Sequence, residues 1–149
     1  MAHFLHSFVV KNNIELVWCF YTDVSHLEII TPKNMALKIL QTENNPFIED
    51  TEIWISARLV TSSKWHSKIT QLKKYEYIDE MLEGRFKTWR HHHKFNKIND
   101  NETEVIDEID FEMPYGILGK ILERFVLVQL RKIFDYRQQS TISVLESKI

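Results

Sequence analysis

Two runs of alternating residues decide the fold of this chain: FKTWRHHHKFNKI (residues 86–98) and ETEVIDEIDFEM (residues 102–113). Successive side chains of a β-strand point to opposite faces of the sheet, so apolar and polar residues in alternation indicate a strand with one buried face. The residues between the runs, Asn99 to Asn101, are typical turn formers. We therefore expect an antiparallel hairpin here.

The apolar residues of the two runs predict how the strands pair. A three-residue loop puts the apolar side chains of both strands on one face, whereas a two-residue loop would set apolar against charged residues along the whole ladder. The expected inward pairs are Trp89 with Phe111, His91 with Ile109, His93 with Asp107 and Phe95 with Val105. The expected outward pairs are Arg90 with Asp110 and His92 with Glu108, and next to the loop Ile98 is expected to pair with Glu102.

The three consecutive histidines therefore divide between two faces. His92 is expected on the solvent side, while His91 and His93 point inward beside Asp107. Three interpretations of the inward group stay open: a hydrogen-bonded polar cluster in a cavity wall, an acid–base or ligand-anchoring group whose histidine pKa Asp107 raises, or a metal site. Because no fourth ligand can be identified, we assign neither a metal nor a cofactor.

The same alternation predicts five further strands, at residues 2–11, 35–42, 52–60, 64–70 and 74–82. Two short helices are expected after the first strand. Asn12 with Glu15 resembles a capping pair for one of them, and Ser25 with Glu28 does so for the other, which ends before Pro32.

The last element, residues 117–149, is predicted to be a helix of roughly 25–30 residues with an apolar stripe along one side. The stripe is formed by Leu122, Val126, Leu130, Ile133 and Phe134, and Arg137 continues it. Arg137 then meets a carboxylate or an anionic ligand, or else extends to water near the helix end. The apolar band of residues 117–130 is wider than one packing face requires. Most of it is expected to be core, and the excess indicates a homodimer contact or a lid over an apolar ligand. Basic residues do not dominate its polar side, so a membrane-surface role is not expected.

The chain as a whole, residues 1–149, is interpreted as a single α+β domain. A curved antiparallel sheet of six to seven strands would wrap around the long C-terminal helix, with the two short helices after the first strand. The 19 basic and 21 acidic residues nearly balance, which argues against nucleic-acid binding. No apolar run reaches the roughly 20 residues of a membrane span, so we expect a cytoplasmic protein with no stable membrane insertion. The one cysteine, Cys19, is expected to be a buried and unreactive thiol.

The chain resembles the START-like, helix-grip superfamily also called SRPBCC. The resemblance lies in residues 17–32 (VWCFYTDVSHLEIITP), 65–69 (WHSKI), 77–80 (YIDE), 83–95 (EGRFKTWRHHHKF), 107–119 (DEIDFEMPYGILG) and 133–137 (IFDYR). It implies a deep apolar cavity between the sheet and the C-terminal helix. It also implies that the ligand-binding groups are Trp65, Tyr77, Asp79, Trp89, His91, His93, Asp107 and Arg137.

Two functions are compatible with this pattern. The first is binding or carrying a hydrophobic small molecule such as a lipid, an isoprenoid or an aromatic polyketide-like compound. The alternative is a cyclase- or dehydratase-like enzyme, with His91 or His93 as catalytic acid or base, Asp107 as orienting group and Arg137 as anion stabiliser. The sequence contains no recognisable nucleophile motif, phosphate loop or cofactor fingerprint.

Overall fold

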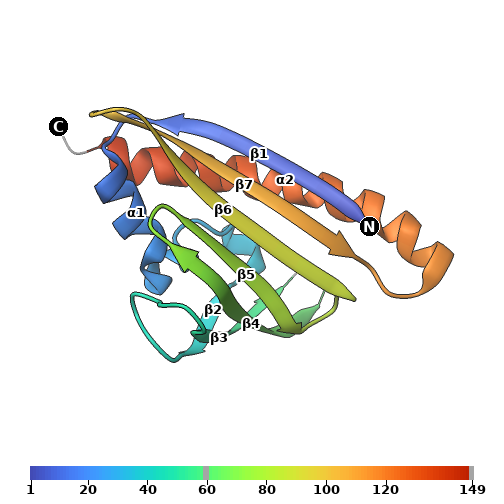
Figure 1. Cartoon of the computed structure of the whole chain (residues 1–149). Coiled ribbons are helices and arrows are strands. Elements are labelled where there is room, and N and C mark those ends of the chain that lie inside the picture. Colours follow the sequence, from blue (N-terminus) through green and yellow to red (C-terminus); the bar gives the residue numbers. More distant parts are fainter. Residues whose placement is uncertain (59–60, 148–149) are drawn as a thin grey trace.

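The computed structural model describes residues 1–58 and 61–147 of the chain. It contains one antiparallel sheet, two α-helices and two short 3-10 helices, η1 and η2 (Figure 1). In chain order the elements are β1 (Ala2–Val10), α1 (Ile14–Thr22), η1 (Val24–Glu28), η2 (Lys33–Met35), β2 (Lys38–Thr42), β3 (Glu52–Arg58), β4 (Ser62–Lys73), β5 (Glu76–Glu83), β6 (Thr88–Asn99), β7 (Glu102–Glu112) and α2 (Gly116–Glu146).

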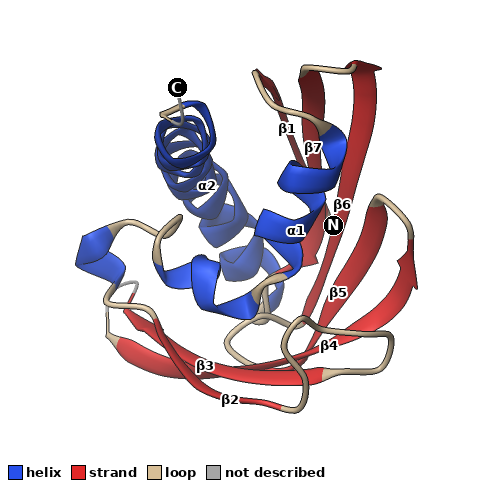
Figure 2. Ribbon diagram, turned by 90° about the vertical axis from the view of Figure 1, so that its left-hand side faces the viewer, coloured by secondary structure: helices blue, strands red, loops and turns tan. Residues whose placement is uncertain are grey.

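The seven strands lie in the order β1-β7-β6-β5-β4-β3-β2. Strands β2 to β7 form a meander of consecutive hairpins, and β1 adds to the outer edge of β7. The sheet curves around α2, which lies on its concave side, while α1 covers one end of that side (Figure 2). The predicted α+β class, the curved sheet and the long C-terminal helix are thus confirmed.

The register predicted for the β6–β7 hairpin is confirmed from Trp89–Phe111 to Phe95–Val105. The predicted loop is wrong. Asn99, not Ile98, pairs with Glu102, and the register shifts by one residue between Lys97 and Asn99. The loop therefore has two residues, and Ile98 is the extra residue of a β-bulge. This extra residue keeps the apolar side chains of both strands on the inner face, which a two-residue loop alone would not do.

The N-terminal caps differ from the predicted ones by one or two residues. Asn13, not Asn12, caps α1, because its side-chain oxygen accepts a 2.9 Å hydrogen bond from the Leu16 amide. Asn12 instead donates from its side chain to the carbonyl of Leu145 at 2.8 Å and so ties α1 to the end of α2.

The second short helix, η1, is capped by Asp23 and not by Ser25. The Asp23 carboxylate accepts a 3.0 Å hydrogen bond from the Ser25 amide. Glu28, the predicted partner in the capping pair, accepts instead from the Ile39 amide at 3.3 Å and so links η1 to β2.

Some element boundaries also differ from the prediction. Strand β2 begins at Lys38, and Met35 belongs to η2. The predicted strand at residues 52–60 is observed as β3 to Arg58, and its last two residues lie outside the described part of the chain. The same holds for the final two residues of the helix predicted at 117–149. Cys19 is exposed, since it lies on the solvent side of α1, so the predicted burial is wrong.

The core consists of two hydrophobic clusters. The first lies around α1 and includes Val10, Val17, Phe95 and Val105, and the second lies under α2. The buried members of the second cluster are Phe4, Phe86, Ile109, Phe111, Leu130 and Phe134. Leu130, Phe134 and Arg137 of the predicted helix stripe are buried, while Leu122, Val126 and Ile133 are half-buried.

The corner between β7 and α2 depends on close backbone packing. Gly119 lies directly against the backbone carbonyls of Met113 and Pro114, where a Cβ atom would have no room. One turn further along, Glu123 points inward, and its carboxylate accepts a 3.2 Å hydrogen bond from the Met113 amide. In the described residues, no helix has the length and apolar character needed to span a bilayer.

Candidate ligand cavity and its histidine cluster

A cavity of about 320 Å³ lies between the concave face of the sheet and α2. Its wall is mostly apolar and aromatic, with contributions from α1, η1, β3 to β6 and α2. Seven of the eight residues predicted to bind a ligand line it: Trp65, Tyr77, Asp79, Trp89, His91, His93 and Arg137. Asp107 does not line the cavity but is buried next to the two histidines, with 1% of its surface exposed.

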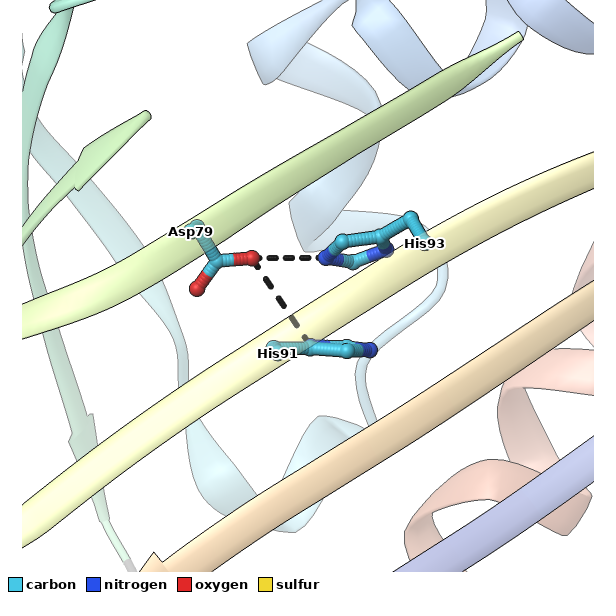
Figure 3. Close-up of side chains that lie close together, drawn as sticks. All are labelled: Asp79, His91 and His93. Carbon is cyan, nitrogen blue, oxygen red and sulfur yellow. Dashed lines mark hydrogen bonds and ion pairs between the residues drawn. The ribbon is translucent and has the colours of Figure 1, made fainter. Parts of the chain in front are cut away.

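His91 and His93 both point inward, as the alternation predicts, and each is held by a carboxylate. The Nε2 atom of His91 lies 2.8 Å from Oδ1 of Asp107. Nε2 of His93 lies 2.6 Å from Oδ2 of Asp79 (Figure 3). The two imidazole rings stack at 3.5 Å between centroids. Tyr77 stacks on the other side of His93 at 4.0 Å. The result is a layered group of rings with a carboxylate on each side.

The strand register explains this arrangement. Asp79 of β5 is the Cα partner of His91, and Asp107 of β7 is the Cα partner of His93. Each carboxylate makes its short contact with the other histidine, which is its diagonal neighbour on the same face of the sheet. The longer contacts are 3.8 Å from Asp79 to His91 and 3.2 Å from Asp107 to His93. Each carboxylate therefore faces both imidazoles.

The electrostatics separate the two histidines. Burial, together with the positive charge of His93, lowers the pKa of His91 to about 4. Burial acts on His93 in the same direction, but hydrogen bonding to Asp107 and Asp79 outweighs it, and the pKa of His93 is raised. At neutral pH His91 is therefore a neutral imidazole, while His93 is the one that favours the charged form.

The two carboxylates stay ionised. Burial raises the pKa of Asp107, but its hydrogen bonds with His91 and His93 more than offset this and hold that pKa well below the ordinary value. The pKa of Asp79 is lowered for the same reason, with a further contribution from the positive charge of Arg137. The imidazoles, and at Asp79 also the guanidinium of Arg137, thus stabilise both carboxylates in the ionised form.

The neutral state of His91 fixes its tautomer. Its Nε2 donates to the Asp107 carboxylate, so Nδ1 carries a lone pair. Nδ1 lies 3.8 Å from Oδ2 of Asp79, which is too far for a hydrogen bond. The lone pair of His91 Nδ1 can therefore accept a hydrogen bond.

Asp79, His91 and His93 also offer three potential metal-ligand atoms within 4.8 Å of one another. The ring planes of the two histidines differ by only 28° and are stacked. Imidazole lone pairs lie in the ring plane, so two nearly parallel stacked rings do not converge on one ion at the roughly 2.0–2.1 Å that zinc requires. A metal would need one ring to rotate out of the stack, so these residues do not fit a metal site as they stand.

Arg137 and Tyr77 are two further polar residues of the cavity wall. Arg137 is 9% exposed, and its guanidinium lies over the Phe134 ring at 5.1 Å. Neither the guanidinium nor the Tyr77 hydroxyl forms a hydrogen bond or ion pair with a side chain in residues 1–58 or 61–147. A buried guanidinium carries five N–H donors, so it is free to donate to an acceptor in the cavity.

The prediction that His92 is a solvent-exposed residue is only partly correct. It lies on the outer face, but only 17% of its side chain is exposed, and its Nε2 lies 2.6 Å from Oε1 of Glu76. The predicted cross-strand pair of His92 with Glu108 is confirmed. The Glu108 carboxylate accepts a 3.0 Å hydrogen bond from the ammonium of Lys94.

The hairpin argument did not identify Asp79 as the second carboxylate of the cluster, although the resemblance includes it among the site residues. The alternation of Tyr77, Asp79 and Met81 in β5 places Asp79 on the cavity side. The sequence did not reveal a second polar contact near the cavity, the 2.7 Å hydrogen bond between the hydroxyls of Tyr21 and Thr141. Thr141 lies four residues after Arg137, on the same side of α2, which is the signal that could have identified it.

The fold is that of the START-like class, and comparisons with known proteins agree. Solved structures with the same fold include a START superfamily protein from Mycobacterium smegmatis (TM-score 0.76, 9% identity, 99% of each chain covered). They also include the Zhui aromatase/cyclase from Streptomyces sp. R1128 (TM-score 0.78, 13% identity, 97% of this chain and 93% of that chain). A third is norcoclaurine synthase from Thalictrum flavum (TM-score 0.76, 10% identity, 99% of this chain and 95% of that chain).

Residues 10–133 match the family described as polyketide cyclase / dehydrase and lipid transport, and the chain belongs to this family. A comparison with curated proteins gives no match.

Proposed function

We propose that this protein binds one hydrophobic small molecule with a single polar end in the cavity between the sheet and α2. The observation that carries the proposal is the cavity wall, which is mostly aromatic and aliphatic and includes the polar groups of Tyr77, His91 and Arg137. Pockets of this make-up, in a size range of about 300–1,000 Å³, are typical of small-molecule sites. A volume of about 320 Å³ favours a compact ligand over a large one.

The polar groups suggest how such a ligand is oriented. Arg137 offers donors, His91 Nδ1 offers an acceptor, and the Tyr77 hydroxyl can act as either. The apolar body of the ligand would then contact the aromatic wall that includes Trp65 and Trp89, whose rings lie 5.2 Å apart. In this proposal Asp79 and Asp107 orient the histidines and do not touch the ligand.

The electrostatics support binding over acid–base catalysis. A catalytic base works best with a pKa near the working pH, and a pKa of about 4 makes His91 a weak base. Nε2 of His93 lies 2.6 Å from Asp79 and Nδ1 lies 3.2 Å from Asp107, so both ring nitrogens face carboxylates of the cluster. The alternative, a cyclase-like enzyme, is suggested by the family description and by the Zhui aromatase/cyclase, a structural relative.

The test is a titration of the purified protein with N-phenyl-1-naphthylamine, a neutral apolar fluorophore. Saturable binding of one probe per chain is expected, since the proposal assigns one ligand to this cavity. Ser67→Phe should abolish it, because Ser67 is buried in the cavity wall and a phenyl ring there fills the space.

Ser62→Phe is the matched control, since Ser62 is an exposed residue of the same strand and should leave binding unchanged. If Ser67→Phe does not fold, Ala57→Leu fills the same cavity by a smaller amount. Probe binding that both cavity-filling variants retain at wild-type affinity would contradict the proposal. Turnover of an aromatic polyketide-like substrate that disappears in His91→Ala, with probe affinity intact, would favour the enzyme.

A further inference from the structure

The first half of α2 carries an apolar surface that faces solvent. We call it the outer face of α2. It consists of Tyr115, just before the helix, and Ile117, Leu118, Ile121, Phe125 and Val128, whose exposed fractions range from 55% to 86%. Single exposed apolar residues are ordinary on proteins, but a continuous row of them usually marks an interaction surface.

The spacing shows that this row is a second apolar side of the helix. Ile117, Ile121, Phe125 and Val128 follow one another at intervals of three or four residues, so they lie along one side. Leu130 and Phe134 pack against the sheet from the opposite side. The first turns of α2 also extend past the end of the sheet, which leaves their outer side uncovered (Figure 1).

The charges on this part of the helix are of one sign. Lys120, Arg124, Arg131 and Lys132 are all exposed. The one acidic residue between 115 and 132 is Glu123, which is buried with its carboxylate on the Met113 amide. The prediction that basic residues do not dominate the polar side of this helix is therefore wrong, because Glu123 is removed from the surface.

We propose that the outer face of α2 docks the protein onto a bilayer that contains anionic phospholipid. A helix lying in the membrane interface needs apolar side chains that enter the headgroup region and basic side chains that reach the phosphates, and this surface has both. The docking is peripheral, so it requires no membrane-spanning helix.

The position of the surface connects it to the cavity. Phe125 belongs to the outer face and also lines the cavity, so the cavity wall reaches the surface at this turn of the helix. Val126 and Gln129, its neighbours on α2, line the cavity as well. On η2, Met35 also lines the cavity. Docking by the outer face thus brings one wall of the cavity to the lipid.

A second copy of the chain fits this surface less well. A two-fold symmetric dimer places the same patch of both copies face to face. Arg124 and its basic neighbours would then lie against their own counterparts, and no exposed acidic residue between 115 and 132 would compensate them. An anionic lipid surface supplies the opposite charge.

The experiment is sedimentation of the purified protein with vesicles, either phosphatidylcholine alone or equal parts of phosphatidylcholine and phosphatidylglycerol. The mixed vesicles should bind at least about tenfold more tightly, and added salt should weaken the binding. Ile117→Glu combined with Ile121→Glu should abolish it, since both side chains lie on the outer face and neither lines the cavity.

Leu82→Glu combined with Ile98→Glu is the matched control. It replaces two exposed apolar residues of β5 and β6 and should leave vesicle binding unchanged. No vesicle binding, equal binding to both vesicle types, or equal loss in the two double variants would each overturn the proposal. So would a concentration-dependent dimer that the Ile117→Glu/Ile121→Glu variant converts to a monomer, because the occupant would then be a second copy.

Discussion

The two faces of β7 carry two histidine–aspartate pairs of nearly equal length and opposite surroundings. On the inner face, Asp107 lies 2.8 Å from His91, and the two side chains are 1% and 7% exposed. On the outer face, Asp110 lies 2.7 Å from His3, and these side chains are 38% and 55% exposed. The two distances are nearly equal, so the two pairs differ mainly in how deeply they are buried. Water can replace either outer partner, whereas a lost inner partner leaves a buried group without compensation.

The largest expected effect comes from removing the inner carboxylate. Asp107→Ala should lower the free energy of unfolding by about 3–5 kcal/mol, because it leaves the His91 donor buried without a partner and removes one of the two carboxylates that face His93. Asp110→Ala, the same change on the outer face, should cost no more than about 1 kcal/mol. Urea unfolding followed by circular dichroism measures both. Equal costs for the two variants would show that burial does not distinguish the pairs.

The second effect is a pH dependence that belongs to the inner pair alone. The pKa of His91 lies near 4 in the folded protein and near 6.5 when unfolded, so between these values the unfolded chain binds a proton that the folded chain does not. Stability should therefore fall by about 3 kcal/mol as pH drops from 6.5 to 4. Urea unfolding at a series of pH values measures this loss.

The neighbouring groups act outside that window. Because the pKa of His93 is raised, this group contributes to the free energy of unfolding. Its contribution is complete below the unfolded pKa and is lost as pH rises through the folded pKa. The lowered pKa values of Asp79 and Asp107 give contributions lost only as pH falls below the ordinary range of a carboxyl group. His91→Gln should remove the fall between pH 6.5 and 4, and His3→Gln on the outer face should keep it. If the stability of His91→Gln still falls between pH 6.5 and 4, another group must cause the fall.

The smallest effect extends the comparison to pairs that involve a tyrosine hydroxyl. Tyr21→Phe should cost about 1 kcal/mol, or somewhat more, because it removes the partner of the fully buried Thr141 hydroxyl. Tyr75→Phe removes an exposed hydrogen bond to Glu15 and should leave the unfolding midpoint unchanged. Thermal unfolding of the two variants decides this, and a larger loss for Tyr75→Phe would contradict the role given to burial.

The sequence predicted those parts of the fold that depend on short-range pattern. Alternation in residues 86–113 was enough to pair His93 with Asp107, because a short loop leaves few possible registers. The bulge at Ile98 was not predictable in this way, since a bulge changes the loop length without changing the inward phase. Asn12 and Asn13 are equally good caps by composition, and the choice depends on the contact of Asn12 with Leu145, distant in the chain.

The sequence predicted which side chains point inward at the site, but not which contacts they form with one another. Which histidine forms the short contact with which carboxylate depends on diagonal packing across three strands, which alternation alone does not encode. The neutral state of His91 follows from burial in the assembled cavity. The inward position of Glu123 could have been read from the sequence, because it lies seven residues before Leu130 on the same side of α2.

The measurement that tests the account most directly is native mass spectrometry of the protein purified from cells without organic solvent. A cavity that holds one apolar ligand predicts a species heavier than the bare chain by a single small molecule, which denaturation releases and Ser67→Phe lacks. A bare chain in every preparation, together with no saturable binding of N-phenyl-1-naphthylamine, would contradict it.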